Sequence, residues 1–216
     1  QDLCLPDMLH GRILRPPTRV HRLKKLDSTS VKMMSGVIDV VVKGSFMGVI
    51  AETEYEAINA VKELEENSLW DKIADVVPYS HAIERILHDR SDQKVVLERG
   101  KTYSETKSVI SATYFRPFIL HGSVAPSAAA ACFNHQKELT VWSHTQGPFQ
   151  LRVALSELLK MDEEKIRVIH VNGAGCYGHN GADDAALDAV LLAFKVVGRP
   201  VMVKWDRSDE HKWEPL

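Results

Sequence analysis

The residues best suited to chemistry form one glycine-rich stretch, Gly173-Ala174-Gly175-Cys176-Tyr177-Gly178-His179-Asn180-Gly181. It falls between an expected strand at 166–171 and an expected helix that begins near Asp183. Glycine lets the backbone adopt positive φ and come close to a bound group. Free N–H groups at a helix start can face an anion or the acceptors of a heterocycle. The stretch therefore predicts a ligand cradle, and the alternative is a tight strand-to-helix turn with strained glycines.

The spacing of Gly173, Gly175 and Gly178 also matches G-x-G-x-x-G, the phosphate-binding pattern of dinucleotide folds. That fingerprint expects, in addition, an acid at the end of the following strand. Asp206 ends that strand, but at a longer distance from the glycines than is usual. A nicotinamide-dinucleotide domain is therefore an alternative that rests on this match alone.

A second candidate, Ser143-His144-Thr145-Gln146, follows an expected strand at 138–143 and immediately precedes a helix. Polar side chains at the carboxyl end of a strand in an α/β unit commonly face the ligand crevice, where the Gln146 amide could donate a hydrogen bond. The alternative, which the residue types alone favour, is that Thr145 or Gln146 satisfies the helix start.

Other reactive residue types have simpler interpretations. His121 is either a site residue or a buried histidine with satisfied ring nitrogens. Asp183 and Asp184 are interpreted as acids in a first helical turn, where they stabilise the helix dipole. Cys176 lies near a helix start, which favours a thiolate, but no base for a nucleophile can be identified. The ten histidines are scattered without the spacing of a zinc-hydrolase helix, so no protein-ligated metal is expected.

Composition narrows the function classes. The 216 residues are 44% hydrophobic and 26% charged, as in ordinary globular proteins. A formal net charge of -2 offers no basic surface for a nucleic acid. The apolar runs are too short or too interrupted to cross a bilayer. Cys4, Cys132 and Cys176 have no paired spacing, which argues against a disulfide framework or a thiolate zinc site and leaves the compartment open.

Hydrophobic periodicity and loop composition predict two domains, 1–100 and 101–216. The first reads as a strand-like segment followed by a strand-strand-helix module and a short helix, and the second alternates strand and helix in the α/β manner. Strands are expected at 18–27, 37–42, 46–51, 138–143, 166–171 and 201–205, helices at 54–67, 148–160 and about 183–197, a short helix after Ser80, and an extended segment at 105–115.

Three separated segments resemble, in the right order, the molybdopterin-binding subunit of molybdenum hydroxylases, the xanthine dehydrogenase and aldehyde oxidase family. They are Leu5 to Pro17, Phe118 to Pro126, and Thr145-Gln146 with Gly173 to Gly178. The first segment is similar to the opening of the hammerhead domain, which Gly36-Val37 and Gly48-Val49-Ile50-Ala51-Glu52 continue. Two departures are visible, because Ala125 stands where the family usually has glutamate and Tyr177 where it has phenylalanine. The loop is most similar to the nicotinate dehydrogenase and isoquinoline oxidoreductase branch.

The resemblance implies a mixed fold, with an α/β hammerhead domain over 1–100 and a truncated first portion of a molybdopterin-binding α/β domain over 101–216. It implies molybdopterin, often extended as a cytosine dinucleotide in bacterial members. The family hydroxylates a carbon of an N-heterocycle or aldehyde with water as oxygen source. By this resemblance Gln146 hydrogen-bonds the apical oxygen on molybdenum, and the cofactor-binding residues are Gly175, Cys176, Tyr177 and Gly178.

The resemblance also implies partners that the chain does not contain, namely the remainder of the large subunit and an iron-sulfur domain or subunit. The family's general base is a glutamate in a C-terminal half that this sequence lacks. We therefore expect a fragment that is inactive alone and does not carry the cofactor. The alternative is a noncatalytic interaction or assembly module that keeps the fold without a cofactor.

Overall fold

The computed structural model describes residues 2–75 and 119–215, with short stretches at 84–85, 88, 94–97, 99–100, 110–112, 114 and 116. The chain divides into two compact units, residues 1–73 with 119–216, and residues 74–118. Glu84, Arg85 and His88 of the short helix expected after Ser80 are helical, and the rest of it lies outside the described residues, as does most of the segment 105–115. The first unit, here called the sheet unit, contains every helix and strand given below.

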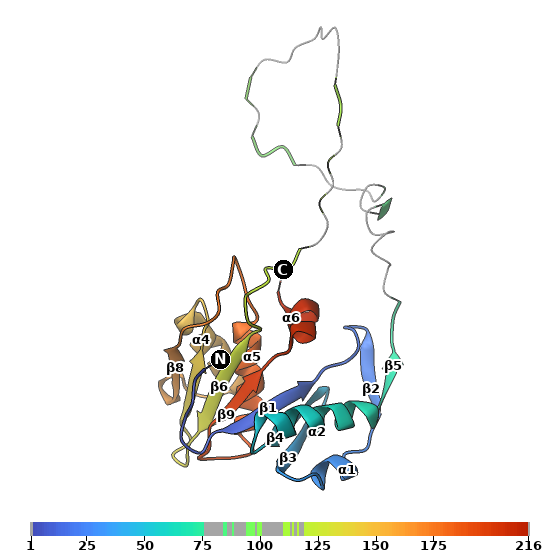
Figure 1. The fold of residues 1–216 in the computed structure, drawn as a ribbon. Coiled ribbons are helices and arrows are strands. Elements are labelled where there is room, and N and C mark those ends of the chain that lie inside the picture. Colours follow the sequence, from blue (N-terminus) through green and yellow to red (C-terminus); the bar gives the residue numbers. More distant parts are fainter. Residues whose placement is uncertain are drawn as a thin grey trace. The chain divides into compact units, whose positions relative to one another are not determined.

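A seven-stranded mixed sheet in the order β3-β4-β1-β9-β6-β7-β8 organises the sheet unit (Figure 1). Its strands are β1 Leu9–Leu14, β3 Val37–Lys43, β4 Phe46–Ala51, β6 Ala128–Phe133, β7 Leu139–Ser143, β8 Ile166–His170 and β9 Val201–Lys204. The pairs β1–β9 and β7–β8 are parallel, and the other neighbours are antiparallel. A second sheet pairs β2 His21–Leu26 with β5 Ser68–Lys72. The fold is thus mixed α/β.

Helices cover both faces of the large sheet. Side chains alternate along each strand, so Ala129 and Val203 face one side with α5 Ala182–Ala193, whereas Ala128 and Met202 face the other. The second face of β3, β4 and β1 packs against α2 Glu54–Glu66. The remaining helices are α1 Thr29–Lys32, α4 Pro148–Leu159, the 3₁₀ turn η1 Glu163–Lys165 and α6 Arg207–Trp213.

Two glycines let α5 approach the early strands closely. A Cβ on Gly11 of β1 would lie 2.4 Å from Leu192 Cδ1, and one on Gly48 of β4 would lie 2.9 Å from Leu192 Cδ2. Leu192 is fully buried. Because no larger residue fits beneath it, these glycines join β1 and β4 to a helix that comes much later in the sequence.

A charged and aromatic cluster follows β1. Arg15 pairs with Asp188 of α5, and the Trp205 Nε1–H donates to the same carboxylate at 2.9 Å. The Arg15 guanidinium lies 4.4 Å from the centre of the Trp205 ring, a cation–π arrangement. Burial raises the pKa of Asp188, opposed by Arg15 and the indole N–H. The cluster fixes the end of β1 against α5 and the end of β9.

Most expected elements are confirmed, with ends within a few residues. The helix expected over about 183–197 ends earlier, at Ala193, because residues 194–198 form turns. Six elements were not predicted: the strands β1, β5 and β6, the helices α1 and α6, and the 3₁₀ turn η1. The domain division at residue 100 stays a prediction, and strands from both stretches share the large sheet.

Exchanging Asp188 for asparagine removes the charge that faces Arg15 inside the fold. We expect Asp188→Asn to lower the free energy of unfolding by about 3 kcal/mol, since Arg15 loses its direct carboxylate partner and keeps only Asp209, 3.9 Å away. Urea unfolding followed by circular dichroism measures this. Asp183→Asn, the same exchange at an exposed position in the first turn of α5, is the control and should cost less than about 1 kcal/mol.

Asp209 predicts a pH dependence of stability. Burial and the neighbouring Asp206 raise the pKa of Asp209 from 3.8 to about 6, although Arg15 opposes the shift. A carboxyl whose pKa is higher in the folded chain favours folding below its unfolded value, and that contribution is lost as the pH rises to about 6. Asp209→Asn should therefore melt like the wild type at pH 4 and higher than it at pH 7. Gln136→Ala, at an exposed uncharged residue of the turn between β6 and β7, should show no such trend, and a falling difference for Asp209→Asn would contradict the prediction.

Candidate functional site

The strand directions bring the two predicted site segments to one edge of the sheet. β7 and β8 are parallel, so the residues after Ser143 and the residues after His170 leave the sheet on the same side. β9 runs in the same direction, because both β7 and β9 are antiparallel to β6. In such sheets the carboxyl ends of the strands form the ligand crevice. The candidate site lies at this edge.

Gln146 and the glycine loop, residues 172–181, are in direct contact. The Gln146 side-chain Nε2 donates a hydrogen bond to the Gly178 carbonyl at 3.1 Å, across 32 residues of sequence. Thr145 has the other role considered for this segment, because its Oγ1 accepts from the N–H of Gly147, the N-cap of α4, at 3.1 Å. The two adjacent polar residues thus divide the tasks: Thr145 serves the helix start and Gln146 reaches the loop.

The glycines of the loop are required by geometry. Gly175 and Gly178 have φ of +96° and +125°, and Tyr177 between them has φ of +48°. A Cβ on Gly178 would lie 2.9 Å from His121 Cδ2. Gly173 has no positive φ, but a Cβ there would lie 2.6 Å from the His144 ring. The loop is thus a strained strand-to-helix turn, as one interpretation had it, and the ligand cradle stays a prediction.

His144 is the buried support under this loop. Its Nε2 accepts from the Ala128 N–H at 3.3 Å, and its Nδ1 lies 3.3 Å from the Asn180 amide nitrogen. The Asn180 Oδ1 accepts from the N–H of Ala182 at the start of α5. Burial lowers the pKa of His144, so the ring is neutral at pH 7. A neutral ring linked to β6, the loop and α5 holds the loop without adding charge to the site.

An open cavity of about 440 Å³ lies between the two segments. Its lining comes from the end of β7, the start of α4, the end of β8 and the glycine loop: His144, Thr145, Gln146, Pro148, His170, Gly173, Gly175, Cys176 and Asn180. The volume is in the range of small-molecule sites. Every segment that the sequence singled out for a ligand, apart from the stretch around His121, contributes to this lining.

The loop can hold a polar heterocycle. No backbone N–H from Gly173 to Gly178 donates a hydrogen bond to another residue of the described part of the chain. Together with the free N–H of the Gln146 amide, these groups offer donors beside a cavity whose lining includes Gly173 and Gly175 but neither Tyr177 nor Gly178. A flat, acceptor-rich ring system such as a pterin suits this donor set. Within the described residues, no group of three or more histidine, cysteine or acidic side chains could hold a metal ion by itself.

A second loop, residues 119–127, supports the glycine loop from behind. The Val124 N–H donates to the Ala174 carbonyl at 3.2 Å. Arg207 of α6 donates to the carbonyls of Ser123 and Val124, each at 2.8 Å. The buried Glu210 accepts from the Ser127 N–H and hydroxyl at 2.8 and 3.0 Å. Sequence reasoning missed these contributions of α6, although an aspartate three residues before another acid is a helix-start signal.

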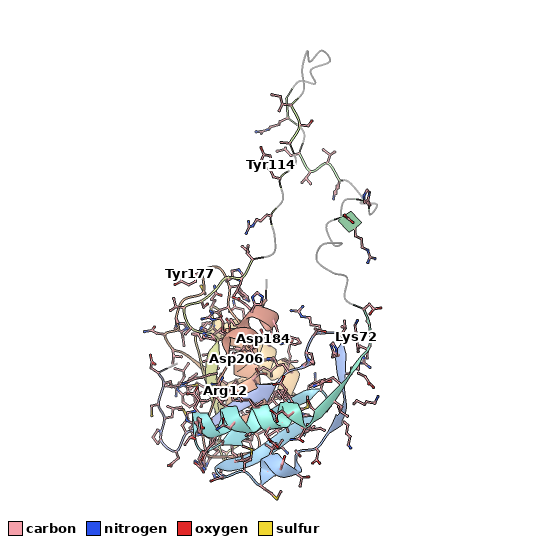
Figure 2. All side chains as sticks on the ribbon, turned by 45° about the vertical axis from the view of Figure 1, so that its right-hand side comes forward. Arg12, Lys72, Tyr114, Tyr177, Asp184 and Asp206 are labelled. Carbon is pink, nitrogen blue, oxygen red and sulfur yellow. The ribbon has the colours of Figure 1, made fainter. Side chains whose placement is uncertain are left out.

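The other expected site residues fall as follows. Cys176 is half-buried in the cavity lining, and Tyr177, labelled in Figure 2, is 63% exposed beside Gly175. Asp183 and Asp184 occupy the first turn of α5, as interpreted from the sequence. His121 is half-buried, and its Nδ1 lacks a hydrogen bond, so it is not a satisfied core histidine.

The dinucleotide alternative loses its geometric basis. A dinucleotide fold needs the strand after the glycine loop and helix to lie close to the strand before them. Here β9 is separated from β8 by β6 and β7. Asp206 is the N-cap of α6, where its side chain accepts from the Asp209 N–H. Nothing then remains of the fingerprint except the glycine spacing.

Comparison with known proteins agrees with this geometry. The family profile of the molybdopterin cofactor-binding domain matches residues 87–214. A nicotinate dehydrogenase subunit of Pseudomonas putida is 39% identical over 226 residues, which cover 99% of this chain and 19% of that protein. A probable xanthine dehydrogenase subunit of Bacillus subtilis is 26% identical, over 96% of this chain and 32% of that protein. Quinoline 2-oxidoreductase from Pseudomonas putida 86 has the same fold, with a TM-score of 0.75, 18% identity and coverage of 97% of this chain and 32% of its own.

The chain belongs to the molybdopterin cofactor-binding domain family of the xanthine dehydrogenase and aldehyde oxidase type, as the resemblance predicted. It is similar in particular to the nicotinate dehydrogenase subunit. It spans between about a fifth and a third of the length of the curated relatives it matches. In the residues that the structure describes, no helix is long and apolar enough to cross a membrane.

Replacing Gly173 tests the close approach of the loop to His144. The Cβ of Gly173→Ala would meet a buried ring held on two sides, so we expect the variant to lose about 2 kcal/mol of stability. Gly44→Ala is the control, because Gly44 has φ of +59° but nothing within 4 Å of an added Cβ. It reports backbone strain alone, about 1 kcal/mol. Thermal unfolding measures both, and equal losses would contradict the steric argument.

Proposed function

We propose that this chain forms one side of the molybdopterin site in the large subunit of a molybdenum hydroxylase. The intact enzyme would hydroxylate a carbon of an N-heterocycle or aldehyde, with water as the oxygen source. One observation carries the proposal: the Gln146 amide is bonded to the carbonyl of Gly178, in the middle of the glycine loop. The two family elements are therefore parts of one cradle.

The proposed task of Gln146 is to present a fixed hydrogen bond to the metal end of the cofactor. A glutamine amide carries two N–H groups and one carbonyl oxygen. One N–H is used by Gly178, which sets the orientation of the amide and leaves the second N–H for a ligand. A preoriented donor needs no reorganisation when the ligand arrives, and this is the way in which fixed dipoles contribute most to catalysis.

The backbone of Gly175, Cys176, Tyr177 and Gly178 is proposed to hold the pterin. Two of these residues have positive φ as glycines, and Tyr177 adopts it at a cost. The strain keeps unpaired N–H groups available beside the cavity. When bound, molybdopterin supplies the two-electron redox chemistry, whereas the chain binds and orients it.

N-heterocycles are the substrate class we favour. Two of the similar proteins, the nicotinate dehydrogenase subunit and quinoline 2-oxidoreductase, are named for substrates with a ring nitrogen. The proposed partners are the remainder of a large subunit and an iron-sulfur domain or subunit that takes up the electrons. We expect the 216-residue chain alone not to turn over substrate, because the resemblance assigns the general base to the C-terminal half of the family.

Metal and pterin analysis of the complete gene product, purified from its source, tests the proposal. We expect about one molybdenum and one pterin per chain in the wild type. Gln146→Leu should retain the pterin but lower kcat by roughly 10–100-fold, because it removes a fixed hydrogen-bond donor near the metal. Gly178→Val should lower the pterin content itself.

Gly44→Ala serves as the control, since this turn joins β3 to β4 and lies in no part of the cavity lining. It should keep both molybdenum and activity. A complete gene product that contains neither molybdenum nor pterin would overturn the proposal and support the noncatalytic interaction module instead.

A further inference from the structure

Glu214, the C-cap of α6, is a buried carboxylate that receives no hydrogen bond from the described residues. Its side chain is 1% exposed, and neither carboxyl oxygen has a partner within residues 2–75 and 119–215. Buried polar groups in native proteins are nearly always paired, and each exception calls for an explanation. The backbone of Glu214 is held firmly, because its N–H donates to the Glu210 carbonyl at 3.0 Å. The position of the carboxylate is thus set by the helix.

The surroundings of Glu214 are unfavourable for a negative charge. Burial raises the pKa of this carboxyl, as does the neighbouring buried Glu210, whereas His121 and His179 lower it. The C-terminal end of a helix also repels an anion. An acid retained against these costs needs a partner that makes use of it, and His121 is the group in place to do so.

His121 lies between Glu214 and the glycine loop. Its Nδ1 is 3.4 Å from Glu214 Oε1, at ion-pair distance but without the angle of a hydrogen bond. The opposite edge of the ring, Cδ2 and Nε2, lies where Gly178 leaves room for it, 2.9 and 3.1 Å from the position of an added Cβ. A small rotation of the ring would bring Nδ1–H into line with the carboxylate. The imidazole therefore joins α6 to Gly178.

The path continues into the candidate site. Gly178, against which His121 lies, is the residue whose carbonyl accepts the hydrogen bond of Gln146. The segment that carries His121 is itself held to α6, through Arg207 at Ser123 and Val124 and through Glu210 at Ser127. Arg207, Glu210 and Glu214 thus all contact the 119–127 segment behind the glycine loop. Glu214 is the one that contacts His121, the residue that lies against Gly178.

We propose that Glu214 is a positioning residue, whose carboxylate accepts the Nδ1–H of His121 and so keeps the imidazole against Gly178. The glycine loop is thereby held in the position at which the Gly178 carbonyl accepts the hydrogen bond of Gln146. The relevance of this loop position to a cofactor rests on the proposed function. The loop position itself does not, because it is a property of the chain without any ligand. The two can be tested separately.

Chymotrypsin cleavage after Tyr177 reports on how firmly the glycine loop is held in this position. The Tyr177 side chain is exposed, but cleavage requires the loop to open, so its rate follows the local opening equilibrium. The peptide that ends at Tyr177 is followed by mass spectrometry in the 216-residue chain. Glu214→Leu fills a similar volume without an acceptor and should be cleaved about tenfold faster, the effect of losing one buried hydrogen bond. Glu214→Gln keeps an acceptor oxygen and should stay within about twofold of the wild type.

A double-mutant cycle shows whether Glu214 acts through His121. His121→Ala should also accelerate cleavage, and the double variant with Glu214→Leu should be no faster than either single variant, because both remove the same interaction. The side-chain amide signals of Gln146 in ¹⁵N NMR should shift toward those of a free glutamine in both single variants. His211→Ala, on an exposed residue of the same helix, is the control and should leave the rate and the spectrum unchanged.

Three results would overturn the inference. They are wild-type cleavage of both Glu214→Leu and His121→Ala, independent and additive effects of the two substitutions, or equal acceleration by leucine and glutamine at position 214. If Glu214→Leu fails to fold, His121→Ala still decides the question, because it leaves α6 intact. None of these measurements needs molybdopterin, so a gene product without molybdenum would remove the proposed function and leave this inference standing.

Discussion

The parallel pairing of β1 with β9 is the constraint on which the rest of the sheet unit depends. Three registered pairs, Leu9 with Val201, His10 with Met202 and Gly11 with Val203, join two segments that are far apart in the sequence. They make one sheet from a β1-β4-β3 group and a β9-β6-β7-β8 group. The glycines under Leu192 and the ion pair of Arg15 with Asp188 reinforce the same junction from the helix side. Within the second group, the pairings of β6 with β7 and β9 and of β7 with β8 place the ends of β7, β8 and β9 at one edge.

The candidate site is a consequence of that edge. Neither Gln146 nor the glycine loop forms a cavity by itself, and their contact depends on the parallel pairing of β7 with β8. Behind the loop, the 119–127 segment and α6 supply the support through Arg207, Glu210 and the Glu214–His121 contact. Backbone groups of the glycine loop therefore face the cavity, and charged side chains support the loop from the other side. The sequence of the loop resembles other members of the family, whereas the supporting contacts are evident only from the structure.

Much of this arrangement could be predicted from sequence, where local chemistry and final structure agree. The helical spacing of Ile58, Val61 and Leu64 predicted α2, because a surface helix packs an apolar side on its neighbours. The structure buries Leu64 together with Ala57 and Ala60. The glycine loop was recognised because glycine readily adopts positive φ, as Gly175 and Gly178 do here. The contact of Gln146 with that loop followed from the resemblance, and its hydrogen bond to Gly178 is what the coordinates add.

The elements that escaped prediction are those whose structure is set by distant contacts. β6 begins with four alanines, which have low strand propensity but let α5 pack closely on the sheet. α6 has too few apolar residues for an amphipathic pattern, and its buried face consists of Glu210, with Glu214 just beyond. Acids are read as exposed in a sequence unless their partners are known. His121, Ser127 and Arg207 come from other parts of the fold, so no local pattern could reveal them.

The β1–β9 junction also bears on how the chain reaches its fold. β1 leaves the ribosome long before β9, its neighbour on one side, which lies about 190 residues later. Until that strand is made, β1 can pair with β4 but exposes its other backbone edge, and unpaired edges invite association with other chains. Contacts between such distant segments also slow folding, because the intervening chain must be ordered first. The junction that unites the finished sheet can therefore form only after β9 has been made, and the edge of β1 stays open to misassembly until then.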